Sequence, residues 1–478
     1  MAFRHGSRVT EIPTSISVPV EATATLPVVF GTAPIHLAKT SEYVNEPFIA
    51  YSWEEAITAL GYSDDWEKYT LCEMMDAAFR QFNVAPIVFV NVLDPEVHKA
   101  SGNETVPVVK GKATAKADGI LKDSLVVKLT QETENSLAKD VDYISSFDDD
   151  GKLVIALITN TTAESIHIQF DKLTPEAVDG DDIIGGYNIE TGKRKGLELL
   201  NAIFPKFRLV PAQVLAPKFS TIPGVAAVMK AKASAVNTYF RAFAWDDIDT
   251  TVVNHYQKAN EWKNQNNYVG YNEAPCWPMV ALDDKLYHIS TQAACSVVKV
   301  ANSNGDYPHE SPSNKNLSMN KMVLKDGTKI DLGPDQAELL NSQGITTALN
   351  FMGGWVLWGN CTGAFPTNTD VKDMFIPVHI THNWIANTII LTTWSKVDKP
   401  ITRSLIDNII DTMNNWFNGL HNRNVILGGR VEFRKSDNPT TDLLGGKLRL
   451  RYFTAEPVPA QDIENLLEFD PTYYNSLF

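Results

Sequence analysis

At 478 residues the chain is too long for one ordinary hydrophobic core, so about two to four domains are expected. Hydrophobic residues make up 44% of the chain and aromatic residues 10%, which is typical of a well-packed globular protein. The formal net charge of −15 argues against a nucleic-acid-binding protein, because such proteins gain affinity from Lys and Arg on phosphates. The four cysteines form no CxxC pair, which indicates a reducing compartment and no zinc or redox motif.

The first twenty residues indicate an extended arm. The segment MAFRHGSRVTEIPTSISVPV has two prolines, no helical period and no apolar centre of the kind found in signal peptides. Ile16, Val18 and Val20 alternate with Ser17 and Pro19, which is the pattern of an extended segment with one apolar face. No stretch reaches the roughly 18 apolar residues of a membrane span, so membrane insertion is not expected.

Residues 23–99 predict the first part of a layered α/β core. The expected elements are a strand over 26–34, helices over 52–60 and 70–82, and a strand over 86–92. Ser52 is the predicted N-cap of the first helix, with Glu55 at its third position. The second strand is a near-continuous apolar run, which is typical of a strand covered on both faces.

Residues 100–182 predict an inserted all-β domain. Short alternating segments such as KLVIALIT and SIHIQF are separated by turns rich in Asp, Gly and Thr, with no helical period between them. From 183 to 375 the α/β rhythm returns as the second part of the core. Its expected elements are helices over 196–204, 223–233, 251–264 and 291–302, and strands over 213–217, 238–245, 278–282 and 344–360.

The C-terminal part, 376–478, combines a predicted strand over 374–386 with the clearest helix of the chain, over 401–420. A closing strand over 447–453 alternates apolar and basic residues: Leu448, Leu450 and Tyr452 against Lys447, Arg449 and Arg451. The predicted fold class is therefore α/β, with a layered core, an inserted β domain, an N-terminal arm over 1–22 and a C-terminal arm.

Residues 182–196, DIIGGYNIETGKRKG, superficially suggest a phosphate-binding loop. That motif has four residues between its glycines and a Ser or Thr after the Lys. Here five residues separate Gly186 from Gly192, and Arg194 follows Lys193. The largely acidic stretch 179–182 would repel phosphate, so a turn where the inserted domain rejoins the core is the favoured interpretation.

Other candidates for chemistry are weak. His379 and His382 are expected on a strand, where residues three apart face opposite sides and share no metal. Asp148–Asp150 fits a hairpin tip better than a calcium loop. Asp246 and Asp247 follow a predicted strand, where α/β proteins often place functional groups, but no partner His, Lys or Ser is evident. The sequence predicts no catalytic residue, no metal and no cofactor.

The two arms instead indicate self-association. Exposed strands with one apolar face are a liability for a monomer. In an assembly they join subunits, because a strand can complete the sheet edge of a neighbour. We therefore expect a structural, self-associating protein.

Several segments, in chain order, resemble contractile-tail sheath proteins of myophages and phage-tail-like bacteriocins. They are HGSRVTE, VVFGTAP, VNEPFIAYSWEEAITALGY, DIIGGYNIETGKRKGLELL, VLAPKFS, HESPSNK, AELLNSQGI and GGKLRLRYFTAEPVPAQDIENL. The resemblance spans essentially the whole chain. It rests on the order of these segments rather than on any single motif.

The resemblance implies a core sometimes described as subtilisin-like, in a helical homopolymer of stacked rings around an inner tail tube. Baseplate and tail terminator proteins are further implied partners, with no direct nucleic-acid binding and no membrane insertion. The subunit would be made in the host bacterial cytoplasm and become part of a virion tail or tail-like particle. Contraction would drive the tube through a cell envelope.

The implied functional residues lie at the two ends of the chain. Strand exchange between subunits is expected at Ile16, Val18, Val20, Leu448, Leu450 and Tyr452. The helix over 401–420 is the candidate tube-facing wall, through Arg403, Asp407 and Asp411, although an ordinary solvated face is equally plausible. Two alternatives stay open: a hydrolase on a subtilisin-like core, and another capsid or surface assembly protein that exchanges strands.

Overall fold

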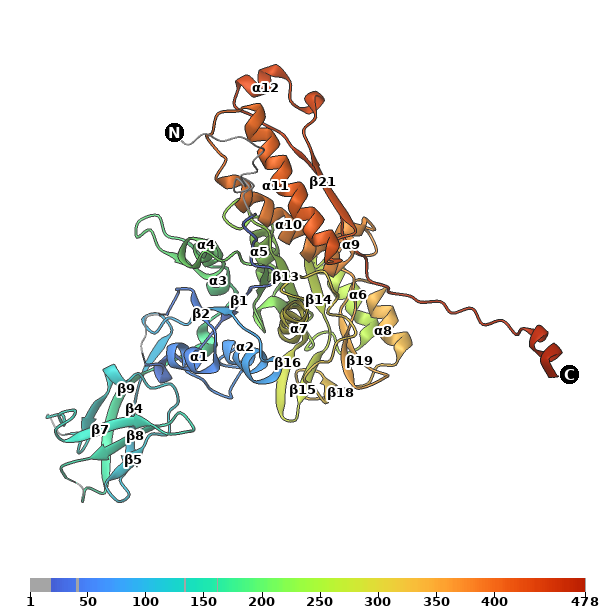
Figure 1. Ribbon diagram of the computed structural model, residues 1–478. Helices are drawn as coiled ribbons and strands as arrows, with labels where there is room; N and C mark the ends of the chain where they lie inside the picture. The colour runs from blue at the N-terminus through green and yellow to red at the C-terminus, as the bar shows by residue number, and fades with distance from the viewer. Residues whose placement is uncertain (1–18, 40–42, 133–134, 161, 478) are drawn as a thin grey trace, which may run out of the picture.

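A computed structural model of the protein describes residues 19–39, 43–132, 135–160 and 162–477. Its centre is a six-stranded sheet with the order β14-β13-β12-β1-β3-β2 (Figure 1). All neighbours in this sheet are parallel except β2, which pairs antiparallel with β3 at the edge. The strands are β1 (Pro27–Gly31), β2 (Phe48–Ala50), β3 (Ile87–Asn91), β12 (Gln213–Leu215), β13 (Phe243–Asp247) and β14 (Glu273–Cys276).

Side chains of the central strands alternate between two hydrophobic cores. Val28 and Phe30 of β1 lie in one core, and Val29 lies in the other. The first core includes residues of α5 (Pro223–Ser234) and of two C-terminal helices, and the second includes residues of α1 (Trp53–Leu60), α2 (Leu71–Met75) and α7 (Ile289–Ser303). Coverage of both faces explains the continuous apolar runs in β1 and β3. The predicted α/β class with a layered core is confirmed.

The predicted helix start at Ser52 is confirmed. The Ser52 Oγ accepts the backbone N–H of Glu55 at 3.3 Å, and the Glu55 carboxylate accepts the N–H of Tyr51 at 2.8 Å. Helix α2 continues as a π-helical segment over Asp76–Phe82. The other helices of this half and of the core are α3 (Gly180–Ile184), α4 (Leu200–Phe207), α6 (Tyr256–Gln265) and α8 (Pro334–Asn341).

Residues between β3 and α3 form a separate β unit that projects from the body (Figure 1). Two three-stranded sheets, β4-β9-β6 and β5-β8-β7, enclose their own hydrophobic core. The strands are β4 (Lys99–Pro107), β5 (Lys112–Thr114), β6 (Val126–Lys128), β7 (Tyr143–Phe147), β8 (Leu153–Leu157) and β9 (Ser165–Leu173). The alternating segments therefore fold on one another, independently of the central sheet.

Residues of the second half of the core form three smaller sheets. They are the hairpin β10-β11, the four-stranded sheet β16-β15-β17-β18 and the hairpin β19-β20. Their strands are β10 (Gly186–Tyr187), β11 (Arg194–Lys195), β15 (Met279–Leu282), β16 (Lys285–His288), β17 (Lys321–Val323), β18 (Lys329–Ile330), β19 (Thr347–Asn350) and β20 (Trp355–Trp358).

The C-terminal part rises above the core as a helical pair with a two-stranded sheet (Figure 1). It contains α9 (Val371–Met374), α10 (Ile376–Trp394), α11 (Arg403–Asn422), β21 (Gly428–Glu432), α12 (Thr440–Leu444) and β22 (Arg451–Ala455). The strand predicted over 374–386 is wrong, because most of this segment belongs to α10. Its β-branched residues suggested a strand, but α10 is buried on most of its surface and so shows no amphipathic period. No helix among the described residues is long and apolar enough to cross a membrane.

Candidate inter-subunit surface

The C-terminal sheet pairs β21 and β22 antiparallel, from Gly428 opposite Ala455 to Glu432 opposite Arg451. Its apolar side faces the helices: Val431 is buried, and Leu450 and Tyr452 pack against the same core as α11. Within the described ranges neither strand pairs with a third strand, although the Val431 N–H of β21 donates to Asn414 Oδ1 of α11 at 2.8 Å. Open edges are templates for pairing with another chain.

The outer face of this sheet carries exchangeable ion pairs. Arg451 donates to Asp437 at 3.1 Å, and this hydrogen bond holds the pKa of the Asp437 carboxyl below its usual value. Glu432 accepts from Arg430 at 2.7 Å and from Arg434 at 2.9 Å, and these bonds likewise lower its pKa. Exposed pairs of this kind add little stability, so partners can replace them at low cost.

The N-terminal segment is tied to the C-terminal helices. The N–H of Ala22 donates to Thr388 Oγ1 at 3.0 Å, and that of Val20 donates to Thr392 Oγ1 at 3.1 Å. Trp416 of α11 donates to the Glu21 carboxylate at 2.8 Å. These bonds fix where the chain enters the core.

The predicted exchange residues are only partly visible in the structure. Ile16 and Val18 lie outside the described residues, and the side chain of Val20 is 57% exposed. Leu448 and Leu450 line a groove beside α10 and α11, together with Tyr452, whose pKa burial raises to about 12. Their role in joining subunits therefore stays a prediction.

Helix α11 separates an apolar from a polar face. Ile409, Met413 and Phe417 are buried in the core, as the predicted stripe requires. Arg403 and Asp411 are exposed, and Arg403 donates to Asp407 at 3.0 Å within the same helix. This polar row is a solvent-facing surface in the single subunit, and contact with a tube stays a prediction.

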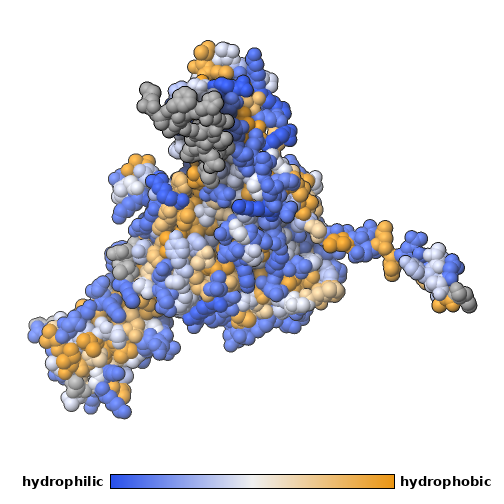
Figure 2. All heavy atoms as spheres, viewed as in Figure 1, coloured by the Kyte–Doolittle hydropathy of each residue, from blue (hydrophilic) through white to orange (hydrophobic). Residues whose placement is uncertain are grey.

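Beyond β22 the chain leaves the body as an extended tail (Figure 1). Its base is fixed by Glu456, whose buried carboxylate lies 3.1 Å from His382 Nδ1 on α10. Burial alone would raise the pKa of Glu456, but the hydrogen bond and charge of His382, together with the Thr454 hydrogen bond, outweigh it and the pKa lies below its usual value. Further out, Leu466 and Leu467 are 88% and 100% exposed, and Figure 2 shows apolar residues on the tail. These side chains are accessible to a partner that packs against the tail.

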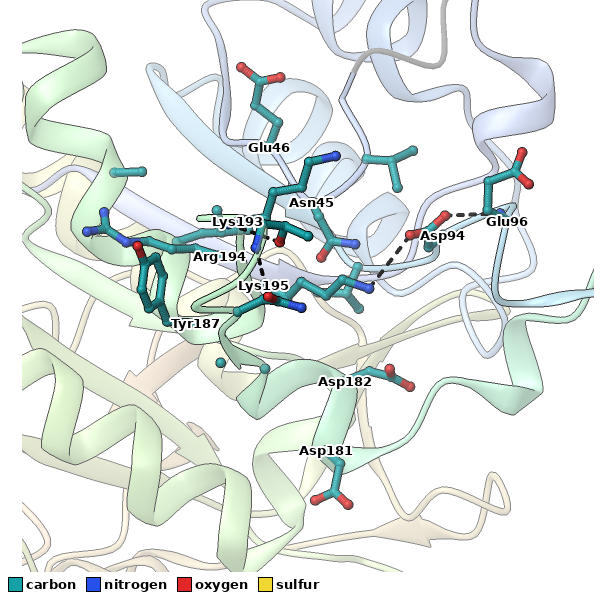
Figure 3. A pocket seen from close by; sticks show the side chains of 18 of the residues that line it. Asn45, Glu46, Asp94, Glu96, Asp181, Asp182, Tyr187, Lys193, Arg194 and Lys195 are labelled. Atoms are coloured by element: carbon teal, nitrogen blue, oxygen red, sulfur yellow. Dashed lines mark hydrogen bonds and ion pairs between the residues drawn. The ribbon is translucent and has the colours of Figure 1, made fainter.

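A cavity of about 1380 Å³ lies where the β unit joins the core, beside the hairpin β10-β11 (Figure 3). Lys195 of β11 faces an acidic side chain, with its Nζ 3.9 Å from Asp94, and His98 lies 3.2 Å from Asp182. Gly185 has a φ of +62°, and a Cβ there would collide with the carbonyl oxygen of Lys195. A glycine is therefore required where these two backbone segments approach closely. The acidic side chains that line the cavity disfavour phosphate binding.

The two histidines predicted on a strand lie instead on α10. His379 is buried, with its pKa lowered to about 4 by burial, and its Nδ1 lies 3.0 Å from the carbonyl oxygen of Lys372. His382 contacts Glu456. Among the described residues no cluster of three or more His, Cys, Asp or Glu has the arrangement of a metal site.

Asp246 and Asp247 are both buried at the end of β13. Asp247 accepts the hydroxyls of Ser220 at 3.0 Å and Ser290 at 2.5 Å. Burial raises the pKa of Asp246 well above its usual value, and the nearby Glu273 raises it further. Both serine hydroxyls therefore donate to the buried Asp247 carboxylate rather than to a histidine.

Sequence reasoning missed two parts of this surface. Strand β21 reads GGRVE, which has two glycines and only one β-branched residue, so no strand signal is present. The tail after Ala455 carries scattered apolar residues between acidic ones, and only its burial state shows that they are exposed.

The chain matches no family model. It is 26% identical over 463 residues to the tail sheath protein of Burkholderia phage BcepMu, covering 94% of this chain and 92% of that relative. It is 32% identical over 130 residues to the tail sheath protein of Escherichia phage P2, covering 27% of this chain and 31% of that relative.

Solved structures of contractile injection systems have a similar fold. A chain of the PVC sheath complex, from an extracellular contractile injection system in its contracted state, has a TM-score of 0.56 at 14% identity, with 99% of both chains covered. A chain of the contracted anti-feeding prophage baseplate has a TM-score of 0.56 at 11% identity, with 98% and 99% covered. The fold is thus that of contractile-injection proteins. By sequence, the chain is related to phage tail sheath proteins over nearly its whole length, which confirms the resemblance.

Proposed function

We propose that the chain is the structural subunit of a contractile tail sheath, which polymerises around an inner tail tube and contracts to drive it through a cell envelope. The full-length relationship to tail sheath proteins carries this proposal. The β21-β22 sheet, which pairs with no third strand among the described residues, and the uncovered tail would supply the physical means of polymerisation, because main-chain pairing adds a strand without a preformed pocket.

Subunits are joined by the two arms in this proposal. The N-terminal arm contributes Ile16, Val18 and Val20, and the C-terminal segment contributes Leu448, Leu450 and Tyr452. Strand pairing survives rotation of the subunit bodies, whereas exposed ion pairs such as those around Glu432 are exchanged for others. Two packings of the same subunits then differ in energy, which is what a metastable sheath needs.

The further partners follow from the same proposal. The polar row Arg403, Asp407 and Asp411 of α11 is the candidate tube-facing surface, and baseplate and tail terminator proteins bind the ends of the polymer. The subunit is made in the host cytoplasm and acts in a virion tail or tail-like particle. In this proposal its role is structural.

Electron microscopy of the purified chain tests the proposal, with hollow cross-striated tubes expected. Removal of residues 1–20, or Leu448→Asp with Leu450→Asp, should leave a folded core that forms no tubes. Leu444→Asp is the matched control, because Leu444 is 83% exposed on α12 and lies outside the groove. Tubes of normal length from either arm variant contradict the strand-exchange mechanism, and compact monomers from the unmodified chain with a tube protein present contradict the sheath assignment.

A further inference from the structure

The projecting β unit is joined to the core by two chain connections that run side by side. The N–H of Thr174, in the connection that leaves the unit, donates to the carbonyl oxygen of His98, in the connection that enters it, at 3.0 Å. The His98 ring lies 3.2 Å from the Asp182 carboxylate at the start of α3. The two connections are therefore tied to each other and to the core at one place.

A second contact between the β unit and the core is made by packing. The His36 ring, on the short 3₁₀ helix Ile35–Leu37, lies edge-on to Phe147 of β7, with ring centroids 5.4 Å apart. Its other neighbour is Tyr69 of the core, at 5.9 Å. Beside it, a Cβ at Gly151 of the β unit would lie 3.4 Å from Leu37 Cδ1. We call this contact the His36 joint.

The His36 joint is built for an uncharged ring. The Nδ1 atom of His36 is buried and has no hydrogen-bond partner among the described residues. Burial lowers the pKa of His36 from 6.5 to about 4; the charge of Asp118 opposes this shift, and that of Lys122 adds to it. Lys122 Nζ also lies 4.4 Å from the centre of the Phe147 ring, and Asp118 is paired with Lys152. A protonated ring would therefore lack an acceptor and face a cation.

We propose that His36 is an acid-sensitive switch between the β unit and the core: when its ring takes up a proton it leaves its place between Phe147 and Tyr69, and the β unit turns about its two chain connections. The cavity beside the connections, of about 1380 Å³, leaves room for this movement (Figure 3). The inference concerns the single subunit and does not depend on the sheath function.

The direction of the effect follows from the lowered pKa. The closed joint binds the proton less tightly than the open one, where water surrounds the ring and the pKa returns to 6.5. The closed joint is therefore favoured above pH 6.5 and loses this advantage as the pH falls toward about 4. With these two values, the open population at pH 5 is about twentyfold that at pH 7.

Hydrogen exchange of the dilute full chain at pH 7 and pH 5 tests the switch. Protection is expressed relative to an unstructured chain at the same pH, which removes the intrinsic pH dependence of exchange. Segments 35–38 and 147–151, on the two sides of the joint, should lose protection about twentyfold at pH 5, while β1 and β12 keep theirs. Equal protection of the joint at both pH values overturns the proposal, and so does an equal loss in β1, which would mean general unfolding.

Variants of three histidines show which ring responds. His36→Phe keeps an aromatic ring in the joint but takes up no proton, so its protection should agree within about twofold at the two pH values. His421→Phe, at an exposed position near the end of α11, is the matched control and should keep the wild-type ratio. His98→Gln, at the chain connections, should keep that ratio as well. A response that persists in His36→Phe, or that disappears in His98→Gln, belongs to another group and overturns the proposal.

Phe147→Ala gives a second test that leaves His36 in place. Without the Phe147 ring, His36 is less buried in the closed joint, so its pKa there should rise toward 6.5. The joint segments should then be less protected at pH 7, and the ratio between pH 7 and pH 5 should become smaller. A wild-type ratio in this variant would contradict the role of the Phe147 contact in the switch.

Discussion

His288 and Glu73 form a buried pair that should make the stability of the core depend on pH. The backbone N–H of His288 donates to Glu73 Oε1 at 2.7 Å, and the ring Nδ1 lies 2.8 Å from Oε2. Burial alone would lower the pKa of His288, but the Glu73 charge and hydrogen bond raise it from 6.5 to about 9. A raised pKa means that the folded state binds the proton more tightly than the unfolded state does.

The size of the effect follows from the shift. At about 1.4 kcal/mol per pKa unit, the protonated His288 stabilises the fold by about 3 kcal/mol. This contribution is fully present below pH 6.5 and is lost as the pH rises through about 9. His288→Gln should therefore lower the free energy of unfolding by about 3 kcal/mol at pH 6, and the difference from wild type should shrink above pH 9.

Urea unfolding between pH 6 and 10, followed by the fluorescence of the buried Trp245 and Trp277, measures this difference. His421→Gln is the control, because His421 is exposed at the end of α11. A wild-type-minus-variant difference that stays constant across this range would falsify the assigned protonation of His288.

Three further changes have expected outcomes that thermal or urea unfolding can check. Asp246→Asn should raise the free energy of unfolding at pH 8, because the raised pKa of Asp246 means that its carboxyl favours the fold only while protonated and opposes it once ionised; an unchanged or lower stability at pH 8 contradicts this. Gly185→Ala should cost more than about 1 kcal/mol, since Gly185 needs a positive φ and its Cβ position is filled. Gly186→Ala has open space and should stay within about 0.5 kcal/mol, so equal effects of the two would rule out the backbone crossing. Met413→Ala, in the core of α11, should cost about 2–5 kcal/mol, whereas Arg403→Ala on its exposed face should change little.

Local signals in the sequence predicted much of the core. The apolar runs of β1 and β3, the cap at Ser52 and the stripe of α11 each depend on a few neighbouring residues, and each is present in the structure. The strand prediction over 374–386 is wrong because most of this segment is a helix that is buried on most of its surface. Once a helix is buried nearly all round, its sequence no longer records which side faces the core, so β-branched residues dominate the pattern.

For the candidate inter-subunit surface, too, the sequence predicted some features and missed others. The strand predicted over 447–453 is present only from Arg451, because residues 447–450 form no strand, although the alternation of exposed basic and half-buried apolar side chains extends through them. Neither the partner strand β21 nor the groove lined by Leu448 and Leu450 could be recognised in the sequence, since both arise from segments that are distant in sequence. The boundaries of the predicted units and the roles assigned to individual residues stay predictions.

The sequence by itself determined the α/β class and the relationship to sheath proteins, because periodicity and ordered motifs are carried by the chain locally. The tertiary structure decided which strands pair, which carboxylates are buried and where the arm enters the body. Those properties depend on which distant segments exclude water from one another, and no local pattern records that.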